Sequence, residues 1–204
     1  MSTSGTAGPR VFLVRHGETE WARLGRHTGR TDVPLTEHGR VQARALRTRL
    51  ADQRFGIVLS SPLSRAVETC RLVGFGDVAG IEPDLAEWDY GTYEGRTSLE
   101  IRESVPGWTV WTHPIEAGET PGESVEEVGA RADRVIARIE GSRDDVALFG
   151  HGHQLRVLAA RWIGLEPASG GRFSLATATL SVLGWERETR VLESWNETCG
   201  VPRG

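Results

Sequence analysis

The sequence VFLVRHGET, residues 11–19, joins a short apolar run to a cluster of polar and charged side chains. Residues 11–14 are all apolar and include two valines, which is typical of a strand buried on both faces. The run ends in Arg15 and His16, so we expect both side chains at the carboxyl end of that strand. Ligands bind at this edge in open α/β sheets. The stretch therefore predicts a sheet built around residues 11–14, with a polar site at its edge.

Strand-like and helix-like segments alternate along the rest of the chain. Apolar runs at 55–59 and 145–149 predict two further buried strands, and alternating patterns at 179–185 and 190–195 predict an antiparallel hairpin. Such alternation predicts an α/β fold of three layers, with a mainly parallel central sheet, helices on both faces and an antiparallel edge.

Capping residues and apolar spacing predict the helices and their inward faces. Thr36 can cap a helix over 37–52, capping-box patterns open helices at 97–100 and 124–127, and a helix is expected over 154–163. Pro62 is expected in the first turn of another helix. The residues predicted to face inward are Val41, Ala45, Leu46 and Leu50, then Ala66, Val67, Cys70 and Val73, then Val125, Val128, Ala132, Val135 and Ile139.

The composition is that of one globular domain. The chain has 204 residues, 38% of them hydrophobic and 25% charged, which is enough to bury a sizeable core. We expect a single domain over 1–204 with residues 1–9 disordered. The irregular segment 104–122 contains several prolines and glycines and two tryptophans, which is typical of a lid-like loop over a substrate.

Charge and cysteine usage restrict the partners and the compartment. The net charge is -4 and no basic stripe is present, so we expect no nucleic-acid partner. No apolar run approaches the roughly 20 residues of a membrane span, and residues 1–9 have no apolar core of a secretory signal. Cys70 and Cys199 are far apart and form no CxxC unit, so we expect a reducing cytoplasm. The oligomeric state stays open, a homodimer included.

Four polar clusters follow predicted strands or lie beside them, at 15–16, 60–65, 87–91 and 150–153. A neutral imidazole can attack phosphorus and form a phosphohistidine, which divides one difficult displacement into two easier ones. Two guanidiniums can bind the phosphoryl oxygens and offset their charge, and a second histidine can stabilise them. A carboxylic acid can protonate the leaving alkoxide and then activate water. The clusters therefore predict phosphoryl transfer without a metal or a cofactor.

The chain resembles the histidine phosphatase superfamily, the phosphoglycerate-mutase-like or acid-phosphatase-like enzymes. The resemblance runs from Val11 to about Trp195 and rests on the sequence RHGET at 15–19 and on three further blocks in the same order. It implies that His16 is the phosphorylated nucleophile and that Glu87 is the general acid, with Glu94 as the alternative. It also assigns phosphate contacts to Arg15, Arg65 and His151, and substrate contacts to Thr28, Gly29, Tyr90 and Gly152.

The resemblance favours hydrolysis over mutase chemistry. Mutases carry an asparagine where this chain has Ala22, and a longer insertion with extra basic residues. Residues 88–150 contain no lysine and no adjacent pair of arginines. We therefore expect a phosphatase for small phosphomonoesters such as sugar phosphates or bisphosphates, similar to broad-specificity acid phosphatases and sedoheptulose-bisphosphatases. The alternatives are a cofactor-dependent phosphoglycerate mutase, a catalytically inactive phosphate-binding module, and a metallophosphatase with His151 and His153 as ligands.

Overall fold

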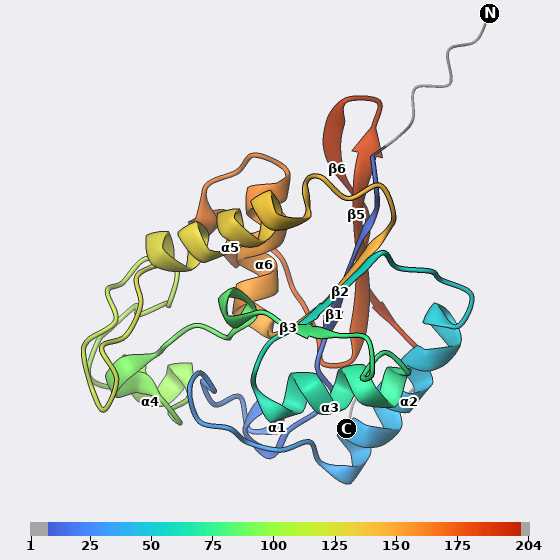
Figure 1. Ribbon diagram of the computed structural model, residues 1–204. Coiled ribbons are helices and arrows are strands. Elements are labelled where there is room, and N and C mark those ends of the chain that lie inside the picture. Colours follow the sequence, from blue (N-terminus) through green and yellow to red (C-terminus); the bar gives the residue numbers. More distant parts are fainter. Residues whose placement is uncertain (1–7, 201–204) are drawn as a thin grey trace, which may run out of the picture.

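A computed structural model describes residues 8–200 of the chain, and their strands form one mixed sheet (Figure 1). Across the sheet the order is β3-β2-β4-β1-β5-β6. The pairs β3–β2, β2–β4 and β4–β1 are parallel, whereas β1–β5 and β5–β6 are antiparallel. The strands are β1 (Val11–Arg15), β2 (Ile57–Ser60), β3 (Gly80–Ile81), β4 (Val146–Gly150), β5 (Thr179–Glu186) and β6 (Thr189–Thr198). The mainly parallel sheet with an antiparallel edge, predicted from the sequence, is confirmed.

Helices cover both faces of the sheet, with α5 and α6 on one side and α2 and α3 on the other (Figure 1). The α-helices are α1 (Glu20–Arg23), α2 (Glu37–Leu50), α3 (Ser64–Val73), α4 (Ser98–Arg102), α5 (Val125–Ile139) and α6 (Gly152–Trp162). Short 3-10 helices are η1 (Pro83–Leu85), η2 (Gly91–Tyr93) and η3 (Pro167–Arg172). No helix within residues 8–200 is long and apolar enough to cross a membrane.

The central strand β4 shows why its sequence is apolar throughout. Successive strand residues face opposite sides of a sheet. Val146 and Leu148 belong to the core beneath α5 and α6, whereas Ala147 and Phe149 belong to the core beneath α2 and α3. All five residues of β4 are buried. The absence of polar alternation in this strand therefore follows from helices on both of its faces.

Side-chain caps begin three helices where the sequence predicts them. The hydroxyl of Thr36 accepts from the backbone N–H of Gly39 at the start of α2. Thr97 and Ser124 each form a complete capping box at the starts of α4 and α5. These bonds satisfy backbone donors that have no partner inside the helix.

The predicted inward faces of α2 and α3 need correction. Val41 and Val67 are 46% and 36% exposed, and the inward faces include polar residues together with apolar ones such as Ala43. Gln42 is buried because its side-chain oxygen accepts from the backbone N–H of Glu18. Arg65 and Thr69 are buried in α3, so this helix turns a polar strip toward the carboxyl edge of the sheet. Helix α3 also begins at Ser64, and Pro62 precedes it rather than lying in its first turn.

The carboxyl ends of β1, β2 and β4 meet at one edge of the sheet. Arg15 is paired with Gly150, and Ser60 with Phe149. Just beyond the strands, the backbone N–H of His16 donates to the carbonyl of Gly150 at 3.1 Å. The N–H of Ser61 donates to the carbonyl of Phe149 at 2.9 Å. This register brings the polar ends of three strands, far apart in the sequence, into one place.

Segment 104–122 packs against the core next to η2. Trp108 and Val110 are buried in the same core cluster as Tyr93, and the carbonyl of Glu116 accepts from the N–H of Thr92 at 2.9 Å. The lid function predicted for this segment stays a prediction. The disorder predicted for residues 1–9 falls mainly on residues 1–7, which lie outside the described residues.

Candidate active site

A cavity of about 270 Å³ opens at the carboxyl edge of the sheet. Six of the nine residues predicted for the site line it: Arg15, His16, Thr28, Glu87, Tyr90 and Gly152. Arg65 and His151 do not line it. Both side chains are fully buried beside His16, and the rings of His16 and His151 have their centres 5.1 Å apart. The structure therefore brings all five predicted catalytic residues to one place, three on the wall and two behind it.

His16 is held as a neutral imidazole with one nitrogen free to react. Its Nδ1 lies 2.7 Å from the carbonyl oxygen of Gly17. A carbonyl only accepts, so Nδ1 carries the proton and the lone pair is on Nε2. Burial lowers the pKa of His16 well below its ordinary value, and the charges of Arg65 and Arg15 lower it further. The imidazole is therefore uncharged at neutral pH, with its single proton on Nδ1.

His151 is oriented by Arg65 on one side and Ser61 on the other. The Nε of Arg65 donates to Nδ1 of His151 at 3.2 Å. Its other nitrogen, Nε2, therefore carries the proton and lies 2.7 Å from the hydroxyl of buried Ser61. Burial, followed by the charge of Arg65, lowers the pKa of His151 well below its ordinary value. His151 is thus a neutral donor rather than a cation.

Arg65 also holds the loop in which substrate contacts were predicted. Its Nη1 donates to the carbonyl of Thr31 at 3.0 Å, and its Nη2 donates to the carbonyls of Thr28 at 2.9 Å and Gly29 at 3.2 Å. A planar guanidinium can serve several acceptors in this way, whereas an ammonium is a single point charge. Arg65 thereby joins α3, His151 and the loop in one network.

Gly29 lies behind the cavity wall rather than on it. Its N–H donates to both carboxylate oxygens of Glu94, at 2.9 and 3.0 Å, and the N–H of Thr31 donates to Glu94 as well. A Cβ at position 29 would collide with the carbonyl oxygen of Trp88. The direct substrate contact predicted for Gly29 has no support in this placement, and Glu94 fixes the loop instead of lining the cavity.

Glu87 lies on the cavity wall at the beginning of α6. Its carboxylate accepts from the backbone N–H groups of Trp88 at 3.0 Å, His153 at 3.1 Å and Gln154 at 2.9 Å. The last two belong to the first turn of the helix, where unpaired donors and the helix dipole favour a negative group. The carboxyl group is therefore fixed in position, with 6% of Glu87 exposed.

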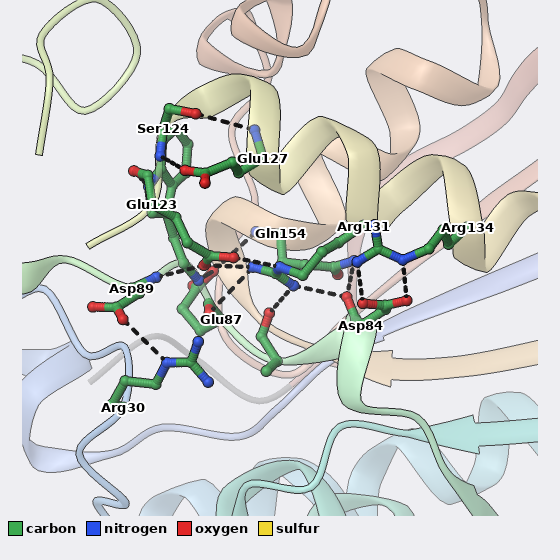
Figure 2. Close-up of polar contacts among 12 residues, drawn as sticks. Arg30, Asp84, Glu87, Asp89, Glu123, Ser124, Glu127, Arg131, Arg134 and Gln154 are labelled. Carbon is green, nitrogen blue, oxygen red and sulfur yellow. Dashed lines mark hydrogen bonds and ion pairs between the residues drawn. The ribbon is translucent and has the colours of Figure 1, made fainter. Parts of the chain in front are cut away.

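Arg131 of α5 binds the segment that carries Glu87 (Figure 2). Its Nε and Nη2 contact the two carboxylate oxygens of Glu123 at 2.7 and 2.9 Å. Its Nη1 donates to the carbonyls of Asp84 and Ala86, each at 2.8 Å. Glu123 in turn accepts from the N–H of Asp89 at 2.9 Å. The buried Arg131 and the partly buried Glu123 thus hold both ends of the segment around Glu87, and no motif in the sequence singles them out.

Aromatic and imidazole rings form the wall beside Glu87. The hydroxyl of Tyr90 lies 2.6 Å from Nδ1 of His153. Burial raises the pKa of Tyr90 and lowers that of His153, so the hydroxyl donates to a neutral ring. His27 also lines the cavity, and burial lowers its pKa to about 4. These three side chains add polar atoms to the cavity without adding charge at neutral pH.

Two further arginines line the cavity and were not predicted from the sequence. Arg156 lies one turn into α6, with its guanidinium 4.6 Å from the ring centre of Trp111. Arg26 donates to the carbonyl of Gly95 and lies 3.6 Å from the carboxylate of Glu100. On an amphipathic helix or in a loop, such residues resemble ordinary surface arginines.

Within residues 8–200, no group of three or more histidine, cysteine, aspartate or glutamate side chains is placed to hold a metal. His151 and His153 are instead engaged by Arg65 and Tyr90. The arginines around them also disfavour a bound cation. Burial raises the pKa of the Cys70 thiol to about 12, so it stays protonated and is not a candidate nucleophile.

The chain belongs to the histidine phosphatase superfamily (branch 1), whose family model matches residues 11–198. An acid phosphatase of Mycobacterium tuberculosis is 44% identical over 199 residues, which cover 92% of each chain. A sedoheptulose 1,7-bisphosphatase of Saccharomyces cerevisiae is 37% identical over 77% of this chain and 68% of its own length. A solved structure from Mycobacterium tuberculosis, at 43% identity, superposes with a TM-score of 0.86 over 94% of this chain and 98% of that one.

These similarities bear on the predictions made from the sequence. The family and the phosphoglycerate-mutase-like fold are confirmed. The class of the protein is confirmed as well: the chain is a phosphatase, a phosphoric monoester hydrolase.

Proposed function

We propose that the chain hydrolyses small phosphorylated metabolites, sugar phosphates or bisphosphates among them, through a phosphohistidine on His16. The observation that carries this proposal is the state of the His16 ring. Its Nδ1–H donates to the carbonyl of Gly17, and the pKa of the ring is lowered. His16 also lines the cavity. Nε2 therefore offers its lone pair to a phosphorus atom at neutral pH.

Arg15 and Arg65 supply the positive charge for the transferring phosphoryl group. Arg15 lines the cavity, and its Nε has no hydrogen-bond partner within the described part of the chain. Arg65 lies behind His16, and its charge acts on the same ring. The positive charge of both residues is concentrated where negative charge spreads over the phosphoryl oxygens during transfer. The neutral ring of His151 lies beside His16 and accepts from Arg65, while its Nε2 proton is directed to Ser61.

Glu87 has the place required of a general acid and base. It lines the same cavity as His16. Backbone N–H groups, rather than a charged side chain, hold its carboxyl group in position. In the first step its protonated form gives a proton to the departing alkoxide. In the second step its carboxylate takes a proton from water, which attacks phosphorus, releases phosphate and restores His16.

The lining of the cavity next to α1 favours hydrolysis over mutase chemistry. Ala22 lines the cavity at the position where the mutases carry an asparagine. Its methyl group offers no hydrogen bond to a phosphorylated donor, so the phosphohistidine is left to water. Adding 2,3-bisphosphoglycerate with 3-phosphoglycerate and measuring 2-phosphoglycerate distinguishes the two outcomes.

The experiment that tests the proposal follows the phosphoryl group itself. A phosphomonoester labelled with ³²P is mixed with the protein, quenched with alkali and analysed for label on the chain. We expect an alkali-stable, acid-labile phosphoenzyme in the wild type and none in His16→Ala. His113→Ala is the matched control, since His113 lies outside the cavity. Phosphate release by His16→Ala at the wild-type rate would overturn the proposal.

We also propose a single domain over residues 1–204 and a cytoplasmic location. Both cysteines are free, and Cys70 is buried, which suits a reducing compartment. The sequence leaves the oligomeric state open, a homodimer included. Size-exclusion chromatography with light scattering will measure whether the chain forms a homodimer.

A further inference from the structure

Gln42 of α2 binds the peptide group whose carbonyl orients the ring of His16. The backbone N–H of Glu18 lies 3.0 Å from the side chain of Gln42, which is buried. A backbone N–H only donates, so the atom that faces it is the amide oxygen. This N–H shares a peptide group with the carbonyl of Gly17, which accepts from Nδ1 of His16 at 2.7 Å. Because the C=O and N–H of a trans peptide point in opposite directions, Gln42 and His16 bind opposite sides of one peptide.

Two glycines let the loop approach α2 closely enough for this contact. A Cβ on Gly17 would collide with the carbonyl of Gly39 in α2, and a Cβ on Gly39 would collide with the backbone of Glu18. Gln42 follows Gly39 by three residues, so both lie on the same face of the helix. The close approach of the two backbones therefore brings the side chain of Gln42 within reach of the Glu18 N–H.

The neighbouring peptide groups have partners of their own. The N–H of Gly17, in the preceding peptide, donates to the hydroxyl of Thr69 at 3.1 Å. The carbonyl of Glu18, in the following peptide, accepts from the N–H of Thr36 at 2.9 Å. In the described part of the chain, the peptide between them has one hydrogen bond on each side, to the imidazole ring and to Gln42. Gln42 is thus the residue that can set its orientation.

The orientation of this peptide decides which nitrogen of His16 carries the proton. With the carbonyl toward the ring, the proton is held on Nδ1, and the lone pair of Nε2 is left for phosphorus. If the peptide turned over, the N–H of Glu18 would donate to Nδ1 instead, and the proton would move to Nε2. Glycine at position 17 makes such a rotation easy, because it lacks a Cβ. The orientation therefore has to be set from outside the loop.

We propose that Gln42 is a positioning residue, which holds the Gly17 carbonyl toward His16 and so keeps Nε2 of the ring free to react. Its consequence for catalysis rests on the proposed function, whereas its effect on the tautomer does not. The bond from Glu18 to Gln42 also polarises the shared peptide, which strengthens the Gly17 carbonyl as an acceptor. The same carbonyl stabilises the phosphohistidine, whose ring is positively charged while Nδ1 keeps its proton.

NMR of the protein labelled with ¹⁵N in its histidine rings measures the tautomer of His16. The signals that are missing in His16→Ala identify this ring. In the wild type we expect a protonated Nδ1 and a free Nε2. In Gln42→Leu and Gln42→Met, which lack the amide oxygen, we expect a second tautomer that is protonated on Nε2. Gln42→Glu keeps an oxygen at the same place and should keep the wild-type tautomer.

Leu50→Ala is the control for a simple loss of packing in α2. Leu50 is buried in the same helix, about two turns beyond Gln42. Its replacement should lower the melting temperature and leave the tautomer of His16 unchanged. A wild-type tautomer in Gln42→Leu and Gln42→Met would overturn the proposal, as would an altered tautomer in Leu50→Ala.

Steady-state kinetics distinguish failure of this inference from failure of the proposed function. With His16 as the nucleophile, kcat should fall about 10- to 100-fold in Gln42→Leu, as is usual when a partner that orients a functional histidine is lost. KM should change less than about threefold, because Gln42 does not line the cavity. A changed tautomer with a wild-type kcat would overturn the role of His16 as nucleophile and leave the positioning intact. A reduced kcat with an unchanged tautomer would overturn the positioning.

Discussion

The Nε of Arg65 donates to Nδ1 of His151 at 3.2 Å, and both side chains are fully buried. This bond fixes the proton of His151 on Nε2, which faces Ser61 at 2.7 Å. The remaining nitrogens of Arg65 hold the carbonyls of Thr28 and Thr31. One guanidinium thus sets the tautomer of a buried histidine and the position of the loop beside the cavity.

Arg65→Lys should therefore lower kcat/KM by about 10²- to 10³-fold, although the charge is kept. A lysine cannot donate to His151 and to three carbonyls at once. Arg71→Lys is the control, since Arg71 lies on the same helix with its side chain 65% exposed. Steady-state kinetics of both variants measure the effect. Wild-type kinetics in Arg65→Lys would mean that charge alone is required at this position.

Gly152 gives Arg15 the room it occupies beside α6. A Cβ on Gly152 would lie 3.1 Å from Cζ and 3.3 Å from Nε of Arg15, so Gly152→Ala should displace the guanidinium. We expect kcat/KM to fall about 10- to 100-fold, since small displacements of a charged group at a reacting centre are costly. The melting temperature should change little, because alanine favours a helix over glycine.

Gly141→Ala is the matched control for Gly152→Ala. A Cβ at Gly141 meets no atom within 4 Å. Its kinetics should be those of the wild type. Equal activity of the two variants would mean that Arg15 tolerates the added methyl group.

Arg131→Gln should destabilise the chain and slow the reaction together. It leaves the carboxylate of Glu123 and the carbonyls of Asp84 and Ala86 without their donors in a nearly buried place. Breaking such a pair costs about 3–5 kcal/mol of unfolding free energy. Because Glu87 lies in the released segment, kcat should also fall. Urea unfolding and steady-state kinetics measure the two effects.

Arg134→Gln is the comparison for Arg131→Gln. Arg134 lies one turn nearer to the end of α5 and pairs with the side chain of Asp84 at the surface (Figure 2). An exposed pair is worth about 1 kcal/mol or less. Equal losses of unfolding free energy in the two variants would show that Arg131 stabilises the segment at 84–87 no more than a surface ion pair does.

The sequence predicted the fold well because its signals are local. Buried strands, capping residues and the alternating hairpin can each be recognised within about ten residues. The same reasoning failed at Val41 and Val67. The spacing of apolar residues in each helix was clear. Which residues face inward, however, depends on polar partners in other segments: Gln42 is buried because it accepts from the N–H of Glu18.

The sequence predicted only those site residues that lie in recognisable motifs. His16 follows a strand that ends in Arg15, and Arg65, Glu87 and His151 lie in blocks with a recognisable order. Arg131 and Arg156 lie on amphipathic helices, where a charged residue is normally exposed to solvent. Only packing against the segment at 84–87 and against Trp111 distinguishes them. Such contacts between distant segments leave no trace in residue spacing.

Acidification should unfold the chain in part through His27. Burial lowers the pKa of this residue to about 4, from an ordinary value of 6.5. Between these two values the unfolded chain binds a proton that the folded chain does not, so stability rises with pH there. The contribution is fully present above pH 6.5 and is lost as the pH falls toward 4. A shift of this size corresponds to about 3 kcal/mol.

His27→Gln should therefore lose less stability than the wild type between pH 7 and about pH 4. Glutamine can keep a hydrogen bond to Ser98, the partner of the His27 ring at 3.2 Å, without taking up a proton. His113→Gln, outside the cavity, is the control and should follow the wild-type curve. Urea unfolding across the range measures all three proteins. If His27→Gln also follows the wild-type curve, the acid sensitivity arises from the other buried histidines, His16, His151 and His153, whose pKa values are lowered as well.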